Sequence, residues 1–109
     1  LAKPGRIFAL IGRHTFSSAM LNAIELKEHC GAILVGGPTG GKPNGYGDVL
    51  SFALPRSKLR VQYSTKFFDQ VDGDPPSVNP DHRVSVTSKR LRTGVDEAFE
   101  WALHAPIEK

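Results

Sequence analysis

Residues 7–42 read IFALIGRHTFSSAMLNAIELKEHCGAILVGGPTGGK, and this stretch decides the fold. It holds two short apolar runs, Ile7–Ile11 and Ala32–Val35, which lack polar alternation and are typical of strands buried on both faces of a parallel sheet. Between them, residues 17–29 place four apolar side chains at helical spacing: Ala19, Met20, Ala23 and Ile24. Gly31 supplies the helix stop. The stretch therefore predicts a strand–helix–strand unit of the α/β class.

Downstream of this unit, the sequence predicts two more strands, Asp48–Leu54 and Leu59–Phe67, joined by a turn as an antiparallel pair. In the second of these strands, apolar and polar residues alternate, which is typical of a strand with one wet face; the polar set is Arg60, Gln62, Ser64 and Lys66.

The last third of the chain is less regular. Residues 69–81 are rich in Asp, Pro and Gly and predict a surface loop. Val84–Val86 indicates at most a short strand. A final helix over Val95–His104 is predicted, with Thr93 as its N-cap.

The composition fits one soluble globular domain over residues 1–109, with 39% apolar and 23% charged residues. No apolar run approaches the ~20 residues of a membrane span. The net charge of +3 comes from scattered lysines and arginines, so we expect no nucleic-acid partner. The single cysteine, Cys30, excludes an internal disulfide, and the spread histidines predict neither a metal nor another cofactor.

Two glycine-punctuated turns follow the two buried strands and carry the candidate chemistry. The first contains Ser17 and the second contains Lys42. Because ligands bind at the carboxyl ends of parallel strands, we expect both turns to line one cleft. There Ser17 can act as a nucleophile and Lys42, if its amine is neutral, as the base. The backbone amide of Ser18, in the first helical turn, is placed to stabilise an oxyanion.

Simpler interpretations of the same residues stay open. Ser17 can be an ordinary N-cap serine, and Lys42 can be a solvated loop lysine. His14 is an alternative base, although it lies too close to Ser17 in sequence to meet it readily. The run from Gly36 to Lys42 also matches a phosphate-binding loop except at its end. Pro43 stands where that loop needs Ser or Thr, so nucleotide binding is not expected.

The order of these motifs resembles the carboxyl-terminal processing (tail-specific) peptidases, serine–lysine proteases of the Clp protease/crotonase superfamily. The matching residues are Thr15-Phe16-Ser17, the turn Gly36–Lys42, and the later Asn79-Pro80-Asp81. The similarity covers about residues 6–86. It implies a crotonase-like strand–helix–strand unit followed by an antiparallel strand pair and a C-terminal helix.

The resemblance also implies a function, which is endopeptidase cleavage of a polypeptide through an acyl-enzyme. Ser17 and Lys42 would be catalytic, and the Ser18 amide would form part of the oxyanion hole. The chain would then be the C-terminal part of a longer, exported, periplasmic or extracellular enzyme. An upstream part of the same protein would supply further elements, so the isolated chain is expected to be inactive.

The chain departs from the family pattern at Met20, Pro43 and Tyr46, and these departures leave other functions open. The base can come from upstream instead of Lys42. The domain can also be a non-catalytic ligand- or peptide-binding relative of the same fold. A third class is a structural module that self-associates as a homo-oligomer through apolar surfaces.

Overall fold

The buried unit expected around residues 7–42 is present in the computed structural model, which describes residues 5–106. Strand β1 (Phe8–Ile11) leads into helix α1 (Ser18–Cys30), and strand β2 (Ile33–Gly36) returns beside β1 in parallel register, with Ile11 opposite Gly36. Gly31 ends α1 in the left-handed conformation, at φ 64°, as predicted. The chain is therefore of mixed α/β class.

Strand β5 (His82–Arg83) completes a three-stranded sheet of order β1-β2-β5, with all strands parallel. The short strand in this part of the chain lies just before Val84–Val86, where at most a short strand was expected, because β2 ends at Gly36. The amide of Val84 donates the last hydrogen bond, to the carbonyl of Gly36 (2.8 Å), and residues beyond it have no strand left to pair with.

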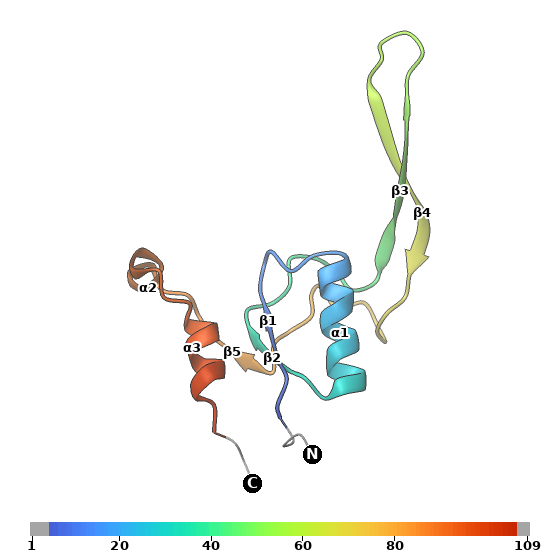
Figure 1. Cartoon of the computed structure of the whole chain (residues 1–109). Helices are drawn as coiled ribbons and strands as arrows, with labels where there is room; N and C mark the ends of the chain where they lie inside the picture. The colour runs from blue at the N-terminus through green and yellow to red at the C-terminus, as the bar shows by residue number, and fades with distance from the viewer. Residues whose placement is uncertain (1–4, 107–109) are drawn as a thin grey trace.

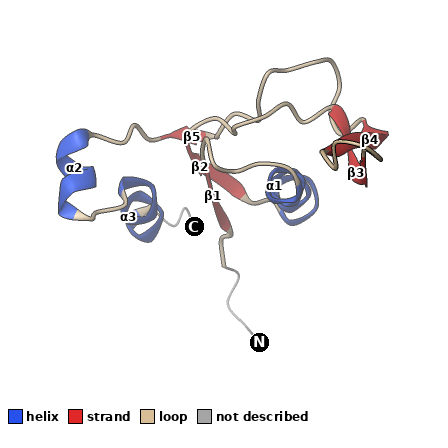
Figure 2. Cartoon of the chain, turned by 90° about the horizontal axis from the view of Figure 1, so that it is seen from above, coloured by secondary structure: helices blue, strands red, loops and turns tan. Residues whose placement is uncertain are grey.

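The two faces of this sheet are covered by different helices (Figure 2). Helix α1 covers one face, where the core consists of Ile11, Ala23 and Leu34, and Leu34 is fully buried. Helix α3 (Glu97–His104) covers the other face, and its Trp101 stacks on His82 with 3.7 Å between ring centroids. The sheet is thus the middle layer of a small three-layer body.

The predicted cap of the last helix is wrong. Helix α3 begins after Asp96, whose carboxylate accepts hydrogen bonds from the amides of Ala98 and Phe99 at 3.0 Å each. Thr93 instead ends an additional short helix, α2 (Ser88–Thr93), which was not predicted from the sequence. The carboxylate of Asp96 is a better capping group for α3 than the hydroxyl of Thr93. Gly94, at φ 71°, separates the two helices.

Strands β3 (Gly45–Ala53) and β4 (Arg60–Phe68) form a two-stranded antiparallel hairpin that projects from the body (Figure 1). We call residues 45–68 the arm. Strand β3 begins three residues before the predicted start, because the glycines at its beginning pair with β4 instead of forming a turn. The arm makes the molecule elongated: its radius of gyration is 18.2 Å, against about 13 Å for a compact domain of this size.

None of the helices in the described part of the chain is long and apolar enough to cross a bilayer.

Candidate functional site

The turns that follow β1 and β2 are in contact, as expected from their positions at the carboxyl ends of neighbouring strands. The amide of Gly40 donates to the carbonyl of Thr15 (3.1 Å), and Thr15 closes its own turn through Gly12. A Cβ on Gly40 would lie 1.9 Å from the carbonyl oxygen of Arg13. Only glycine allows this approach, so the second turn is fitted against the first.

Ser17 has a strained backbone. Its φ of 53° and ψ of −126° are unusual for a residue with a Cβ, and such a conformation costs about 1–3 kcal/mol. Ser17 occupies the N-cap position of α1, but its hydroxyl makes no capping hydrogen bond. Its carbonyl accepts from the amides of Met20 and Leu21 instead. The side chain is therefore not used to stabilise the helix end.

Ser17 and Lys42 line the same pocket, which we call the serine pocket. It has a volume of about 430 Å³ and lies between the start of α1 and the base of the arm. Its apolar wall comes from both elements and from the turns: Phe16, Met20, Leu21, Pro43, Tyr46 and Phe68. The serine hydroxyl is exposed in this pocket and has no hydrogen-bond partner among the described residues.

The amine of Lys42 is bonded to a carboxylate and not to Ser17. Its Nζ lies 2.7 Å from Oδ2 of Asp74, and both side chains are more than half exposed. An ion pair of this kind is formed by the protonated ammonium, whereas a general base needs the neutral amine. The structure thus brings Ser17 and Lys42 to one pocket but does not join them.

A second ion pair lies in the same pocket. Nζ of Lys66 is 3.0 Å from Oδ2 of Asp48, and both residues belong to the arm. The hydrogen bond from Lys66, the positive charge of Lys66 and a hydrogen bond from Thr65 hold the pKa of Asp48 below its ordinary 3.8. Asp48 is therefore an anion at neutral pH. The polar side of the pocket carries two cations, each with its own carboxylate.

The amide of Ser18 opens the first turn of α1 beside Ser17. Among the described residues, no group accepts a hydrogen bond from it. A free amide at a helix N-terminus is a donor for developing negative charge. The third predicted site residue therefore lies beside the first, with its backbone donor available.

His14 does not line the serine pocket. Its Nε2 accepts a hydrogen bond from Nε of Arg13 (3.2 Å) on the exposed side of the turn. In this conformation the imidazole lies beside Arg13 and outside the pocket, so it is not placed to take a proton from Ser17.

Two buried polar side chains organise the site, and neither stood out in the sequence. Oγ1 of Thr39 accepts from the amide of Val78 (2.9 Å), and Oδ1 of Asn44 accepts from the amides of Gln70 and Val71. Together they fasten the loop after the arm to the second turn. A polar residue inside a glycine-rich turn is a sequence signal for such a role. The signal does not reveal the hydrogen-bond partners, because they are distant in sequence.

Asp81 fastens the end of the same loop to the sheet. Its carboxylate accepts from the amide of Leu34 (2.9 Å) and from Nζ of Lys27. Burial raises the pKa of Asp81, but the hydrogen bonds from Lys27 and Leu34 and the charge of Lys27 outweigh it, so the pKa lies below its ordinary 3.8. This residue belongs to the Asn79-Pro80-Asp81 turn singled out in the sequence, and its contacts are structural.

Among the described residues, no cluster of three or more His, Cys, Asp or Glu side chains is arranged to hold a metal ion. In comparisons with known proteins, no family model matches the chain, and no curated protein matches it closely enough to indicate descent.

Proposed function

We propose that this chain carries the nucleophile of a serine peptidase of the carboxyl-terminal processing type, on a crotonase-like α/β fold. The conformation of Ser17 is the observation that supports the proposal best. A serine that merely capped α1 would have an extended backbone and would bond the helix amides. Ser17 has a strained backbone and leaves its hydroxyl free in a pocket. Strain of this kind is concentrated at functional sites in proteins.

The proposed reaction is acyl transfer. Oγ of Ser17 attacks the carbonyl carbon of a substrate peptide bond, and the negative charge that forms on the carbonyl oxygen is stabilised by the Ser18 amide. The C–N bond then breaks, the amine leaves with the proton taken from Ser17, and water hydrolyses the acyl-enzyme.

Lys42 is the proposed base, and the geometry sets a condition on it. Its amine must leave Asp74 and lose its proton before it can accept one from Ser17. Lys66 lines the same pocket in its own ion pair, which makes it the natural control for the role of Lys42.

Turnover of an unstructured protein, followed on the protein at its natural length, tests these roles. We expect Ser17→Ala and Lys42→Ala each to lower kcat by at least about a hundredfold. Ser18→Ala keeps its backbone amide and Lys66→Ala leaves the base in place, so both should stay within about threefold of wild type. Equal losses for Lys42→Ala and Lys66→Ala would reject Lys42 as the specific base.

The apolar wall of the serine pocket supports a second candidate, a non-catalytic domain that binds an apolar ligand or peptide in the same place. Aromatic and aliphatic side chains with a few polar groups are typical of ligand pockets. Equilibrium binding of an apolar peptide separates the two functions. Ser17→Ala would leave binding unchanged in both cases, but it would abolish turnover only in the peptidase.

A further inference from the structure

The outer half of the arm has one apolar face that is exposed. Cross-strand neighbours share a face, and here Leu50 lies opposite Tyr63 and Phe52 opposite Val61. The rings of Phe52 and Tyr63 are in contact on this face, with 6.2 Å between centroids. Phe52 is 50% exposed. An isolated two-stranded hairpin is marginally stable in water, so this face needs a partner.

The tip of the arm continues the apolar face and adds positive charge. Leu59 is 65% exposed at the tip and stands between Lys58 and Arg60. The tip is closed by two backbone hydrogen bonds between Leu54 and residues 58 and 59. From residue 49 to residue 68 the chain carries four cations and no acid: Arg56, Lys58, Arg60 and Lys66.

The loop that follows the arm has the opposite charge. Residues 69–81 contain four carboxylates and no lysine or arginine: Asp69, Asp72, Asp74 and Asp81. Within the described part of the chain, Asp74 pairs with Lys42 and Asp81 with Lys27, whereas Asp69 and Asp72 have no cationic partner. At the arm tip, Arg56, Lys58 and Arg60 have no carboxylate partner among the described residues either. Among the described residues, two complementary charge clusters are therefore unpaired.

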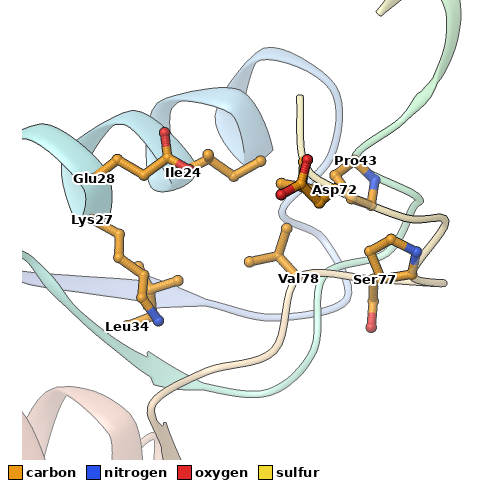
Figure 3. Close-up of a pocket in the computed structure, with 10 residues that line it drawn as sticks. Ile24, Lys27, Glu28, Leu34, Pro43, Asp72, Ser77 and Val78 are labelled. Carbon is orange, nitrogen blue, oxygen red and sulfur yellow. The ribbon is translucent and has the colours of Figure 1, made fainter. Parts of the chain in front are cut away.

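A second pocket lies beside these carboxylates. It has a volume of about 280 Å³ and is formed between α1, β2 and the loop, so we call it the loop pocket. Figure 3 shows Ile24 and Val78 on either side of it, with the carboxylate of Asp72 directed toward it. Its walls are mostly apolar: Ile24, Leu34, Pro43, Val71, Pro75 and Val78. Glu28 and Asp72 add negative charge, and the charge of Lys27 is balanced by Asp81.

We propose that two copies of this chain form a reciprocal dimer by arm exchange. The arm tip of each copy inserts Leu59 into the loop pocket of the other. Lys58 and Arg60 then meet the carboxylates of Glu28 and Asp72. The structure favours a second copy of the chain as the partner. Each copy has an apolar pocket with a negative rim, and each copy has an apolar side chain flanked by cations that matches this pocket.

The dimensions of the arm agree with this arrangement. Its nine-residue strands extend about 30 Å, enough to reach across to a neighbouring body. In a two-fold dimer the two arms run antiparallel, with the faces of Leu50, Phe52 and Tyr63 against each other. An arm face about 30 Å long and about 10 Å wide is smaller than a stable interface needs. The two tip–pocket contacts are therefore required to complete it.

Sedimentation velocity over a range of concentrations, up to about 0.5 mM, tests this proposal on the 109-residue chain. The wild type is expected to show a monomer–dimer equilibrium. Leu59→Glu places a carboxylate in a pocket that already has a negative rim, so dimer affinity should fall at least about tenfold. Ser64→Glu is the control, because it adds the same charge on the polar face of the arm but away from the tip.

A charge exchange makes the test specific for the tip and the pocket. Arg60→Glu and Asp72→Arg should each weaken the dimer by about tenfold, and the double variant should recover to within about threefold of the wild type. Circular dichroism confirms that the variants fold. A wild type that is monomeric throughout the range would overturn the proposal. So would a dimer insensitive to Leu59→Glu, or one that the double variant fails to restore; each points to another occupant of the arm.

Discussion

The α/β body buries its apolar side chains, whereas the arm leaves its own in contact with water. In the body, Leu34 and Val35 are fully buried between α1 and α3. In the arm, Leu50, Phe52 and Tyr63 are about half exposed, although they share one face of the hairpin as core residues of an antiparallel sheet do. The sequence pattern thus specifies which side chains share a face of a sheet. That face becomes a buried core only when another layer covers it.

The largest difference between the two regions should appear when an apolar side chain is truncated in each. Leu34→Ala removes fully buried atoms from a small core, and we expect it to lower the free energy of unfolding by about 2–5 kcal/mol. Phe52→Ala removes half-exposed atoms and should cost less than about 0.5 kcal/mol in the monomer. Urea unfolding at low protein concentration measures both. Similar losses would show that the arm is packed in solution.

The contact between the two turns belongs to the body, and it should be sensitive to one added methyl group. Gly40→Ala places a Cβ against the carbonyl of Arg13, and we expect a loss of about 1–3 kcal/mol in the free energy of unfolding. Gly37→Ala is the matched control, since nothing lies within 4 Å of its added Cβ. The same urea experiment compares them. If Gly37→Ala costs as much, the close approach is not the cause.

The strain at Ser17 predicts an effect of opposite sign. Ser17→Gly relieves a conformation that glycine adopts freely, so the free energy of unfolding should rise by about 1 kcal/mol. Ser18→Gly, one residue later and inside the helix, should lower it by about 0.5–1 kcal/mol. Thermal unfolding of the two variants gives the sign directly. A loss of stability in Ser17→Gly would mean that the hydroxyl stabilises the fold after all.

The smallest effect concerns the link between loop and sheet at Asp81. Its pKa is lower in the folded state than the ordinary 3.8, so its contribution is present above about pH 4 and is lost as the pH falls through the folded value. Because both side chains of the ion pair with Lys27 are more than a third exposed, we expect this contribution to be at most about 1 kcal/mol. Wild type and Asp81→Asn, unfolded in urea between pH 7 and pH 2, should differ near neutrality and converge in acid. A constant difference would exclude a titrating carboxylate.

The central unit was predictable because its signals are local. Two apolar runs, one helical stripe and Gly31 are enough to specify β1, α1 and β2, and the antiparallel arm followed from alternation. The predicted boundaries differ from the structure where a neighbouring residue or strand determined where the element begins or ends. Asp96 displaced Thr93 as a helix cap, and the end of β2 at Gly36 limited β5 to two residues.

The candidate site was predictable only in part. The positions of Ser17, Ser18 and Lys42 around one pocket follow from the ends of parallel strands. The partner of Lys42 does not, because Asp74 lies in a loop whose path is set by distant contacts to Thr39 and Asn44. Nor does the strain at Ser17, since backbone angles at a helix start depend on how the two turns pack.

Covalent labelling tests the central claim most directly, namely that Ser17 is an activated nucleophile. The protein at its natural length is treated with a fluorophosphonate, and the adduct is located by peptide mass spectrometry in the wild type and in Ser17→Ala, Ser18→Ala and Lys42→Ala. We predict an adduct on Ser17 that persists in Ser18→Ala and is lost in Lys42→Ala. A folded protein that forms no adduct, or one whose adduct lies on another serine, would contradict the account.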